Sequence, residues 1–417
     1  MARVSLEDVR AARANLIAGV RRTPMVPFST LAGMSGAAAI WLKCENLQRA
    51  GSFKVRGASN RIAALTADER ARGVITASAG NHAQGVAVAA AAHRVRATVV
   101  MPASTPLAKI EATRGYGAEV LLRGDAYPEA SAEAARMAAE TGMIEVHAFD
   151  DPRIVAGQGT VALEILEDVD DIDVLIVPVG GGGLIAGVAV AAKALRPSIR
   201  VVGVQAAHAP GVARSFRERR AVQVPPAPTI AEGVGAAGPG DVTLPLILEH
   251  VDDVVTVSEE AIAEAMVLLL ERAKFVAEGA GALGVAALHS AAVNVSGKRA
   301  AILISGGNVD LQRLARIVEH GLMEAGRYMN VTVAVEDRPG TLAPLSRLLA
   351  DAGANILSVD HHRFGVRLPV GWVEVALLLE VRNQQHAGEV EAALQSVGYR
   401  RGDRGEPTFV PPGWPSS

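Results

Sequence analysis

Short runs of β-branched residues alternate with alanine-rich segments along most of this chain, and this alternation limits the possible folds more than any other feature. The β-branched runs predict buried strands, and the alanine-rich segments between them predict helices. Strands that alternate with helices favour an α/β fold with a mainly parallel sheet, covered by helices on both faces. In such a fold, ligands bind where strand ends meet helix starts. The expected strands are 74–77, 98–102, 119–122, 174–179, 201–204 and 300–304, and the expected helices include 83–92, 130–140, 184–195 and 259–274.

The size and composition of the chain restrict its architecture and its partners. A chain of 417 residues is too long for one ordinary core, so two or three packed units are expected. Aromatic residues make up only 3%, which favours tight packing of helices on sheets, and a net charge of −3 does not attract nucleic acid or an acidic membrane. The single cysteine, Cys44, excludes an internal disulfide framework and a cysteine-based zinc site, and we expect it to be a buried small hydrophobe.

The N-terminal residues and the apolar runs predict where the protein works. Charged residues at positions 3, 7 and 8 replace the apolar stretch of a secretory signal. Alanine-rich runs such as 86–92 are far shorter than the roughly 20 apolar residues that cross a bilayer. We therefore expect a soluble, cytoplasmic protein that acts on small molecules.

The pattern changes in two parts of the chain. Residues 206–241 are rich in Pro, Gly and Ala and predict irregular structure, whereas 311–324 predicts one more helix. From residue 328 onward a smaller unit is predicted, in which Leu342, Leu345, Leu348 and Leu349 lie on one helical face after a turn at 337–341. Its other expected elements are strands 331–335, 356–360 and 373–380 and a helix near 388–394, without a clear closing strand. The proline-rich tail at 403–417 is expected to be mobile.

A run of glycines lies between a predicted strand and a predicted helix that opens at Leu184. Without Cβ atoms the backbone can approach a ligand closely, and N–H groups beside a helix N-terminus bind phosphate without a charged side chain. A flexible linker is the alternative, but a linker would not join a strand to an apolar helix. A dinucleotide site would need spaced glycines and an acid after the next strand, where this chain has Gln205. The glycines, which favour a phosphate site, are Gly180, Gly181, Gly182 and Gly183.

Lys54 has an unusual setting for a lysine, because Phe53 and Val55 flank it. An apolar niche disfavours the charged ammonium and lowers the pKa, which frees the amine to act as nucleophile and base. Taken alone, a surface role explains Lys54 equally well. Together with a phosphate cradle, however, a reactive lysine is what an enzyme needs to hold pyridoxal 5'-phosphate, which forms a Schiff base with lysine and takes up the electrons of a carbanion.

Two small-residue turns complete the set of candidate site segments. Residues 78–82 follow a predicted strand and precede a helix, so their serine, asparagine and backbone N–H groups can bind a carboxylate, although a helix cap explains them equally well. We expect His82 to be a structural donor rather than a catalyst. Ser305 ends another predicted strand, and its hydroxyl can face a ring nitrogen; a plain turn is the alternative.

These motifs together resemble those of the serine/threonine dehydratases, the fold-type II pyridoxal phosphate enzymes related to the tryptophan synthase β subunit. Specifically, the chain resembles the threonine ammonia-lyases that carry one C-terminal ACT domain. The resemblance covers nearly all of 6–399 and is strongest at 45–58, 78–85, 179–184 and 305–310. It implies a catalytic domain at 1–325 with two open α/β subdomains, the smaller at about 46–149, and an α+β ACT domain at 328–402.

The resemblance also implies a role for each candidate residue. Lys54 would be the Schiff-base lysine and Ser305 would face the pyridine nitrogen, and both are expected to be catalytic. Phe53 would pack by the cofactor ring, Asn81 would bond its ring oxygen, and Gly180 to Leu184 would hold the phosphate. The expected substrate-binding residues are Ser78, Ala79, Gly80, Asn81, His82 and Glu278, and the expected regulatory turn is Asp337, Arg338, Pro339 and Gly340.

The implied reaction is the deamination of L-threonine to 2-oxobutanoate and ammonia by β-elimination of water, with serine giving pyruvate as a side activity. Relatives that racemise serine have serine where this chain has Ala79, and several relatives have a metal-binding glutamate where it has Gln205. We therefore expect negligible racemase activity and no activating cation. Some relatives have proline where this chain has Gly279, next to Glu278. A homo-oligomer, either a dimer or a tetramer, is expected from the family.

Several readings stay open at this level. The enzyme alternatives are a serine dehydratase, a serine racemase, a cysteine synthase or a 3-hydroxyaspartate dehydratase, and a nucleotide-binding oxidoreductase is disfavoured by the glycine spacing. The non-enzyme alternative is an amino-acid sensor. The smaller unit could mediate assembly alone, but feedback regulation by isoleucine, valine or serine is favoured. Isoleucine biosynthesis and threonine breakdown are both possible roles.

Overall fold

The computed structural model describes residues 4–16, 19–225, 227–363, 368–402, 407–412 and 414. It divides into two compact units, Met1–Leu311 and Gln312–Ser417, which are described separately. The division falls after Leu311, the first residue of the helix at 311–324, so the domain bounds of 1–325 and 328–402 stay a prediction. No helix within the described ranges is long and apolar enough to cross a membrane.

The first unit contains a large lobe built on a six-stranded sheet with the order β1-β2-β10-β7-β8-β9. β1 is antiparallel to β2, and all other neighbours are parallel. The strands are β1 (Met25–Pro27), β2 (Ala39–Cys44), β7 (Val174–Pro178), β8 (Arg200–Ala206), β9 (Asp253–Val257) and β10 (Arg299–Ile304). The lobe's helices are α1 (Leu6–Ala14), α2 (Ser29–Ser35), α8 (Pro152–Asp168), α9 (Gly183–Leu195), α10 (Gly211–Glu218), α11 (Thr243–His250), α12 (Glu259–Leu268) and α13 (Gly279–His289), with short turns η1 (Glu45–Leu47), η2 (Arg49–Gly51), η3 (Glu232–Val234) and the π-helix η4 (Leu269–Ala273).

Helices cover both faces of this sheet, as predicted. Leu175 and Val177 of β7 point into a core formed with α1, α8 and α9. The alternate residue, Ile176, faces α13, where a Cβ on Gly284 would lie 3.2 Å from its side chain. Successive side chains of a strand point to opposite faces, so a run of buried apolar residues follows from this double cover.

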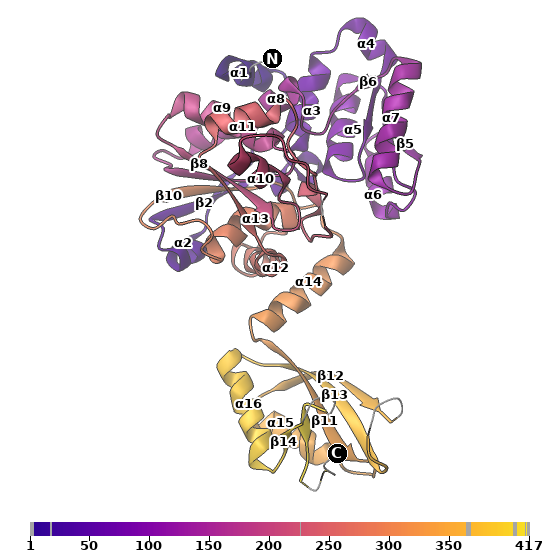
Figure 1. Ribbon diagram of the computed structural model, residues 1–417, viewed down its shortest axis with the longest axis vertical. Helices are drawn as coiled ribbons and strands as arrows, with labels where there is room; N and C mark the ends of the chain where they lie inside the picture. The colour runs from indigo at the N-terminus through magenta and orange to yellow at the C-terminus, as the bar shows by residue number, and fades with distance from the viewer. Residues whose placement is uncertain are drawn as a thin grey trace. The chain divides into compact units, whose positions relative to one another are not determined.

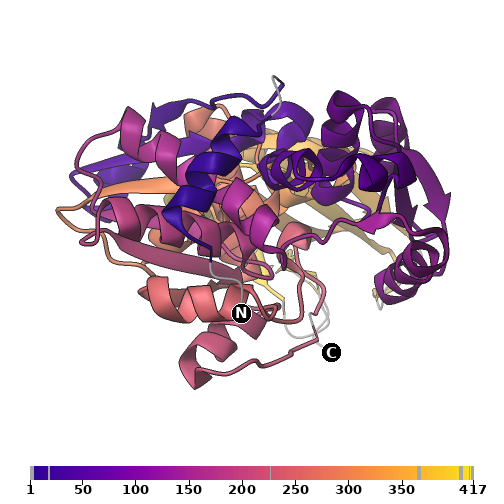
Figure 2. The ribbon, with the colours of Figure 1, turned by 90° about the horizontal axis from the view of Figure 1, so that it is seen from above.

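The smaller lobe of the first unit is a parallel four-stranded sheet with the order β5-β4-β3-β6. The successive residues Val74 and Ile75 of β3 point to opposite faces of the sheet and pack against α5 and α7 respectively. These two helices therefore cover opposite faces, as Figure 1 shows. Figure 2 shows the two lobes side by side. The elements are β3 (Val74–Ala77), β4 (Ala97–Met101), β5 (Glu119–Leu122), β6 (Ile144–Glu145), α3 (Lys54–Ala63), α4 (Ala67–Arg72), α5 (Asn81–His93), α6 (Leu107–Gly115) and α7 (Tyr127–Thr141).

The second unit is a five-stranded sheet with the order β12-β13-β11-β15-β14 and two helices packed on it. Leu345 and Leu349 of α15 are buried in its core, with Leu342 and Leu348 packed beside them, as their spacing predicts. The elements are α14 (Leu311–Glu324), β11 (Tyr328–Glu336), α15 (Leu342–Asp351), β12 (Asn355–His362), β13 (Trp372–Glu380), α16 (Gln384–Ser396), β14 (Arg400–Arg401) and β15 (Phe409–Val410).

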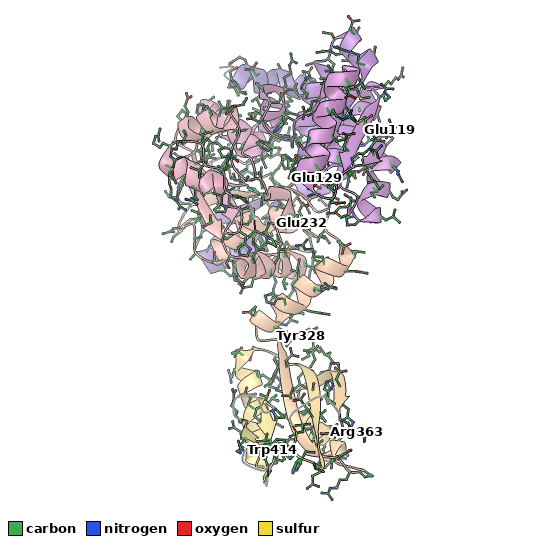
Figure 3. All side chains as sticks on the ribbon, turned by 45° about the vertical axis from the view of Figure 1, so that its right-hand side comes forward. Glu119, Glu129, Glu232, Tyr328, Arg363 and Trp414 are labelled. Atoms are coloured by element: carbon green, nitrogen blue, oxygen red, sulfur yellow. The ribbon has the colours of Figure 1, made fainter. Side chains whose placement is uncertain are left out.

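The expectation of a mobile tail is wrong for residues 407–412 and 414. Phe409 and Val410 pair with β14, and Phe409 also pairs with Val333 of β11, which supplies the closing strand that the sequence hides. Trp414, labelled in Figure 3, is buried and packs edge-on against Trp372 with ring centroids 5.3 Å apart. Burial of these apolar rings offsets the entropy of ordering the chain. Residues 403–406, 413 and 415–417 lie outside the described part.

Two further expectations need correction. The stretch 206–241 is not wholly irregular, because it contains α10, whose Val212 and Ala213 are buried in the large core. The helix expected at 259–274 changes to a π-helical turn at Leu269–Ala273 and ends at Lys274 in the left-handed region, with φ of 63°. Cys44 is buried, as expected, and burial raises the pKa of its thiol to about 12, which makes it unreactive.

Candidate active site

A cavity of about 1440 Å³ lies between the two lobes of the first unit. β3 and β7 both end at this cavity, and each is followed by a turn and a helix, α5 and α9 respectively. Carboxyl ends of parallel strands are where ligands bind in such sheets. The cavity brings together every catalytic, cofactor and substrate residue that the sequence predicts, namely Phe53, Lys54, Ser78, Ala79, Gly80, Asn81, His82, Gly180, Gly181, Gly182, Gly183, Leu184, Glu278 and Ser305.

Lys54 opens α3 and reaches into the cavity. Its Nζ donates to the carbonyl oxygen of Ala148 at 2.8 Å and lies 5.3 Å from the centroid of the Phe53 ring. Burial disfavours the ammonium and lowers the pKa of Lys54 to about 8, although the nearby carboxylate of Glu278 opposes this shift. The amine is therefore neutral in roughly a tenth of molecules at pH 7 and in about half at pH 8, far more often than an ordinary lysine. The Phe53 amide donates to the carbonyl oxygen of Ser305 at 3.1 Å, which ties the start of α3 to the end of β10.

The glycine run makes the connection from β7 to α9. A Cβ on Gly181 would lie 2.3 Å from the ring of Phe149, and Gly182 has φ of +97°, so this turn requires glycine at both positions. The Thr243 hydroxyl fixes the turn by donating to the carbonyl oxygen of Gly181 at 2.8 Å. No described side chain caps the N-terminus of α9. Its first N–H groups therefore remain for a ligand, which suits a phosphate.

The turn at 78–80 leads into α5 in a similar way. No described side chain caps the N-terminus of α5, and the Ser78 hydroxyl accepts from the Gly80 amide at 3.2 Å. Ala79 is half-buried in the cavity wall. His82 Nε2 lies 2.9 Å from the carbonyl oxygen of Val146, and burial lowers the pKa of His82 to about 3, so the ring is neutral and donates to this carbonyl. This geometry agrees with the structural role expected for His82.

A chain of amides and a carboxyl crosses the cavity. The NH2 group of Asn81 donates to Glu278 Oε1 at 2.7 Å, and Asn308 Nδ2 donates to Asn81 Oδ1 at 2.8 Å. Burial raises the pKa of Glu278 to about 7, although the hydrogen bond from Asn81 and the charge of Lys109 oppose this shift. Lys109 forms an ion pair of 3.0 Å with Glu232, labelled in Figure 3, which joins α6 of the small lobe to η3 of the large lobe.

His147 and Asn308 belong to the cavity wall, but the sequence alone assigns no role to either residue. His147 accepts hydrogen bonds at Nδ1 from the amides of Phe149 and Asp150, at 3.2 and 2.7 Å, and burial lowers its pKa. It follows β6, which is too short to give a strand signal. Asn308 lies three residues after Ser305, but its hydrogen-bond partners Ala50 and Asn81 are distant in the sequence, so no local pattern assigns it a role.

A cluster of buried charges anchors α3 behind the cavity. The Arg56 guanidinium donates to both oxygens of Glu45, at 2.9 and 2.8 Å, and to both oxygens of Glu164, at 2.7 and 2.9 Å. Lys43 Nζ donates to Glu164 Oε2 at 2.6 Å. Burial would raise the pKa of Glu45, but Arg56 outweighs burial and holds that pKa below its ordinary value. The cluster contains two cations and two anions, so its charges balance.

Gln205 is fully buried and lies beside the glycine run. Its Oε1 accepts from the amide of Ala213 at 2.8 Å, and its Nε2 lies 3.4 Å from the carbonyl oxygen of Gly180. A neutral amide engaged in this way is a poor ligand for a hard cation. Across the part of the chain that the structure describes, no three His, Cys, Asp or Glu side chains group closely enough to hold a metal.

The expected regulatory turn belongs to the second unit and connects β11 to α15. Gly340 has φ of +89°, a conformation that favours glycine, and the Arg338 amide donates to the carbonyl oxygen of Glu336 at 2.9 Å. Asp337 pairs with Arg363, labelled in Figure 3, at 3.0 Å. The turn, which consists of Asp337, Arg338, Pro339 and Gly340, is exposed.

Comparisons with known proteins match both units. The family model "Pyridoxal-phosphate dependent enzyme" matches residues 16–306, and the ACT domain model matches residues 329–399. The L-threonine ammonia-lyase of Thermotoga maritima is 48% identical over 396 residues, which cover 95% of this chain and 98% of that protein. The L-threonine ammonia-lyase of Geobacter sulfurreducens is 47% identical over 384 residues, which cover 91% and 94%.

Solved structures match the first unit. The structure of maize serine racemase is 38% identical with a TM-score of 0.73, and the match covers 78% of this chain and 99% of that chain. A threonine deaminase from T.th. is 42% identical with a TM-score of 0.69, and the match covers 74% and 99%. The processed form of threonine deaminase isoform 2 from Solanum lycopersicum is 33% identical with a TM-score of 0.71, and covers 75% and 93%.

Proposed function

This chain belongs to the pyridoxal-phosphate-dependent enzymes, and we propose that it deaminates L-threonine to 2-oxobutanoate and ammonia, with L-serine giving pyruvate as a side activity. One observation carries the proposal. The uncapped N-termini of α5 and α9 open into the same cavity as the amine of Lys54. Two anion sites beside a reactive amine suit a cofactor phosphate and the carboxylate of an amino acid.

The residues present fit pyridoxal phosphate. When bound, this cofactor withdraws electrons from the substrate Cα and so makes its proton acidic. The backbone of Gly180 to Leu184 would hold the phosphate at the start of α9, and Asn81 would donate to the ring oxygen from its NH2 group. Phe53 would pack by the ring.

Lys54 and Ser305 would be the two catalytic residues that the protein contributes. The Lys54 amine would accept the Cα proton, and its lowered pKa makes the neutral form that can do so more abundant than in an ordinary lysine. The β-hydroxyl would then take up a proton and leave as water, so that the Cα proton and the hydroxyl together amount to one water lost. The enamine that remains takes up water in solution and gives the oxo acid and ammonia. Ser305 is a neutral partner for the ring nitrogen, so it does not hold a proton there, which favours prompt loss of the hydroxyl.

The turn at Ser78, Ala79 and Gly80 would bind the substrate carboxylate through the first N–H groups of α5. His82 would support this turn by its bond to Val146, and Glu278 would lie on the substrate side of the cavity. The buried carboxyl of Glu278 is poised to change its charge near neutral pH, because burial raises its pKa to about 7.

Steady-state kinetics on L-threonine and L-serine test this function. Lys54→Ala should abolish the release of oxo acid, whereas Lys298→Ala, on an exposed turn before β10, should leave it unchanged. A folded Lys54→Ala protein that turns over threonine at the normal rate would refute the proposal. A protein without turnover that binds amino acids would indicate the sensor alternative.

Serine racemisation is the second candidate, because the serine racemase structure matches the first unit. Racemisation needs a second acid or base on the opposite face of Cα. Ala79, in the wall of the cavity, has no proton to give. We therefore propose that racemisation is negligible, and conversion of L-serine to D-serine at a rate near that of deamination would contradict this.

We also propose that residues 1–325 carry the reaction and that the ACT domain at 328–402 regulates it. The exposed turn that starts at Asp337 supports an effector site, and a feedback role would suit isoleucine synthesis in the cytoplasm of the cell. A dimer or tetramer would bring such turns together. Arg338→Ala should keep kcat and lose any change of KM with isoleucine, valine or serine. Equal sensitivity in both proteins would contradict an effector site at this turn, and no sensitivity in either protein would argue for an assembly role alone.

A further inference from the structure

Asn308 makes two short hydrogen bonds that use both hydrogens of its amide. Its Nδ2 donates to the carbonyl oxygen of Ala50 at 2.7 Å and to Asn81 Oδ1 at 2.8 Å. A third contact, to Gln84 Oε1, is longer at 3.4 Å. Since an NH2 group has two hydrogens, the two short contacts account for both.

The Ala50 end of this chain of contacts lies in a tight turn of the backbone. Ala50 has φ of 64° and Gly51 has φ of +71°, so the backbone makes a tight turn just before Lys54. A backbone carbonyl can only accept, so the Asn308 amide must present its nitrogen to Ala50. A flipped amide would instead bring two acceptor oxygens to within the same 2.7 Å.

The orientation of Asn308 determines that of Asn81. Because Asn308 donates, Asn81 must present Oδ1 to it, and the NH2 group of Asn81 then points to Glu278 Oε1 at 2.7 Å. The second hydrogen of that NH2 group remains for another acceptor in the cavity. Without Asn308, the Asn81 amide could rotate and turn its oxygen toward the carboxylate of Glu278.

We infer that Asn308 is a positioning residue, whose carboxamide, fixed by the carbonyl oxygen of Ala50, orients the NH2 group of Asn81 toward Glu278 and the cavity. The inference rests on the proposed function only in assigning Asn81 and Glu278 to the reacting site. It connects the backbone turn before Lys54, the end of β10 and the start of α5, which come from distant parts of the chain. Asn308 acts on the reaction through Asn81.

The titration of Glu278 reports on this arrangement. A hydrogen bond donated by Asn81 favours the carboxylate, so losing it should raise the pKa of Glu278 further above its present value of about 7. The charged groups that face this carboxyl are Lys54, Lys109 and Glu232, and a substitution at Asn308 changes none of them.

The test measures the infrared band of the protonated Glu278 carboxyl in the holoenzyme over a range of pH, with Glu278→Gln identifying the band. Asn308→Leu has a similar shape and removes the donor without adding charge, and Asn308→Ala removes it without crowding. The midpoint should rise by roughly half to one pH unit in both variants. Asn294→Leu, at an exposed position that does not line the cavity, should leave the midpoint unchanged.

Folded Asn308→Leu and Asn308→Ala proteins that keep the Glu278 midpoint of the unmodified protein would overturn the inference. If the proposed function also holds, the acidic limb of kcat/KM for L-threonine should move by the same amount. A shifted infrared midpoint in a protein without threonine turnover would reject the proposed function and leave the positioning role supported.

Discussion

Replacing Arg56 by leucine should destabilise the first unit far more than removing an exposed ion pair. Arg56 is fully buried and holds both Glu45 and Glu164, so Arg56→Leu leaves two carboxylates beside the one cation of Lys43 in this cluster. Removing one partner of a buried ion pair costs about 3–5 kcal/mol. For a unit of about 310 residues, that loss should lower Tm by roughly 5–8 °C.

Arg13→Leu is the matched control. Arg13 also reaches from a helix to a glutamate of α8, but the side chains of Arg13 and Glu167 are 42% and 43% exposed. Such a pair contributes about 1 kcal/mol or less. Thermal unfolding of the holoprotein at pH 8 compares the two variants, with circular dichroism and cofactor absorbance as separate signals.

Two further measurements isolate the charge effect. Adding Glu45→Gln to Arg56→Leu restores neutrality and should recover part of the lost stability. In Arg56→Leu the pKa of Glu45 should rise above its ordinary value, because burial is no longer opposed by Arg56. A raised carboxyl pKa costs stability as pH rises through that pKa, so the deficit should grow between pH 5 and 8. An Arg56→Leu protein as stable as Arg13→Leu at both pH values would refute this reasoning.

Four more outcomes are expected. Apoenzyme gains visible colour as its lysine binds pyridoxal phosphate, and the rate depends on the fraction of neutral amine. Since the pKa of Lys54 is about 8, this rate should rise about tenfold from pH 7 to 9 and then level off. A rate that continues to rise up to about pH 10.5 would indicate an ordinary lysine. Ala79→Ser should raise the conversion of L-serine to D-serine, and chiral chromatography that finds no D-serine would contradict this. EDTA should change kcat/KM for L-threonine by less than about twofold, because the amide of Gln205 is engaged within the protein, and loss of activity that magnesium restores would show otherwise. Gly187→Ala should lower Tm, because its Cβ would lie 2.1 Å from the carbonyl oxygen of Val155 at the contact of α8 and α9. Gly33→Ala in α2 meets open space and should add about 0.5–1 kcal/mol to the free energy of unfolding. Equal Tm values for the two variants would count against this packing.

The sequence predicts the parallel lobes well because their strands are buried on both faces. Continuous apolar runs such as 174–179 and 300–304 mark β7 and β10 within one or two residues. Several strands escaped prediction, for two reasons. β6, β14 and β15 each span two residues, which is too short for a periodic signal. β2 and β9 are longer, with six and five residues, but each contains a charged residue, Lys43 in β2 and Asp253 in β9. β15 exists because Phe409 and Val410 fill the core of the second unit, which a reading of local composition does not detect.

The candidate site divides in the same way. Lys54, Asn81 and the glycine run can be recognised from their immediate sequence neighbours, which are apolar residues around Lys54 and a strand and a helix on either side of the other two. The structure brings all three to one cavity. Asn308 depends on contacts with residues 227 and 258 positions away, so no local pattern reveals its orientation. Tertiary contacts, rather than motifs, determine such positioning residues, and their roles remain predictions for experiment.

The division of the cavity wall between two sheets has a consequence for how the protein matures. The turn at 78–80 and the glycine run belong to different lobes, so neither lobe alone has a complete set of cofactor contacts. A newly made chain should therefore capture its cofactor only after both lobes have folded and docked. The appearance of yellow colour during refolding should then mark the last step of assembly rather than the first.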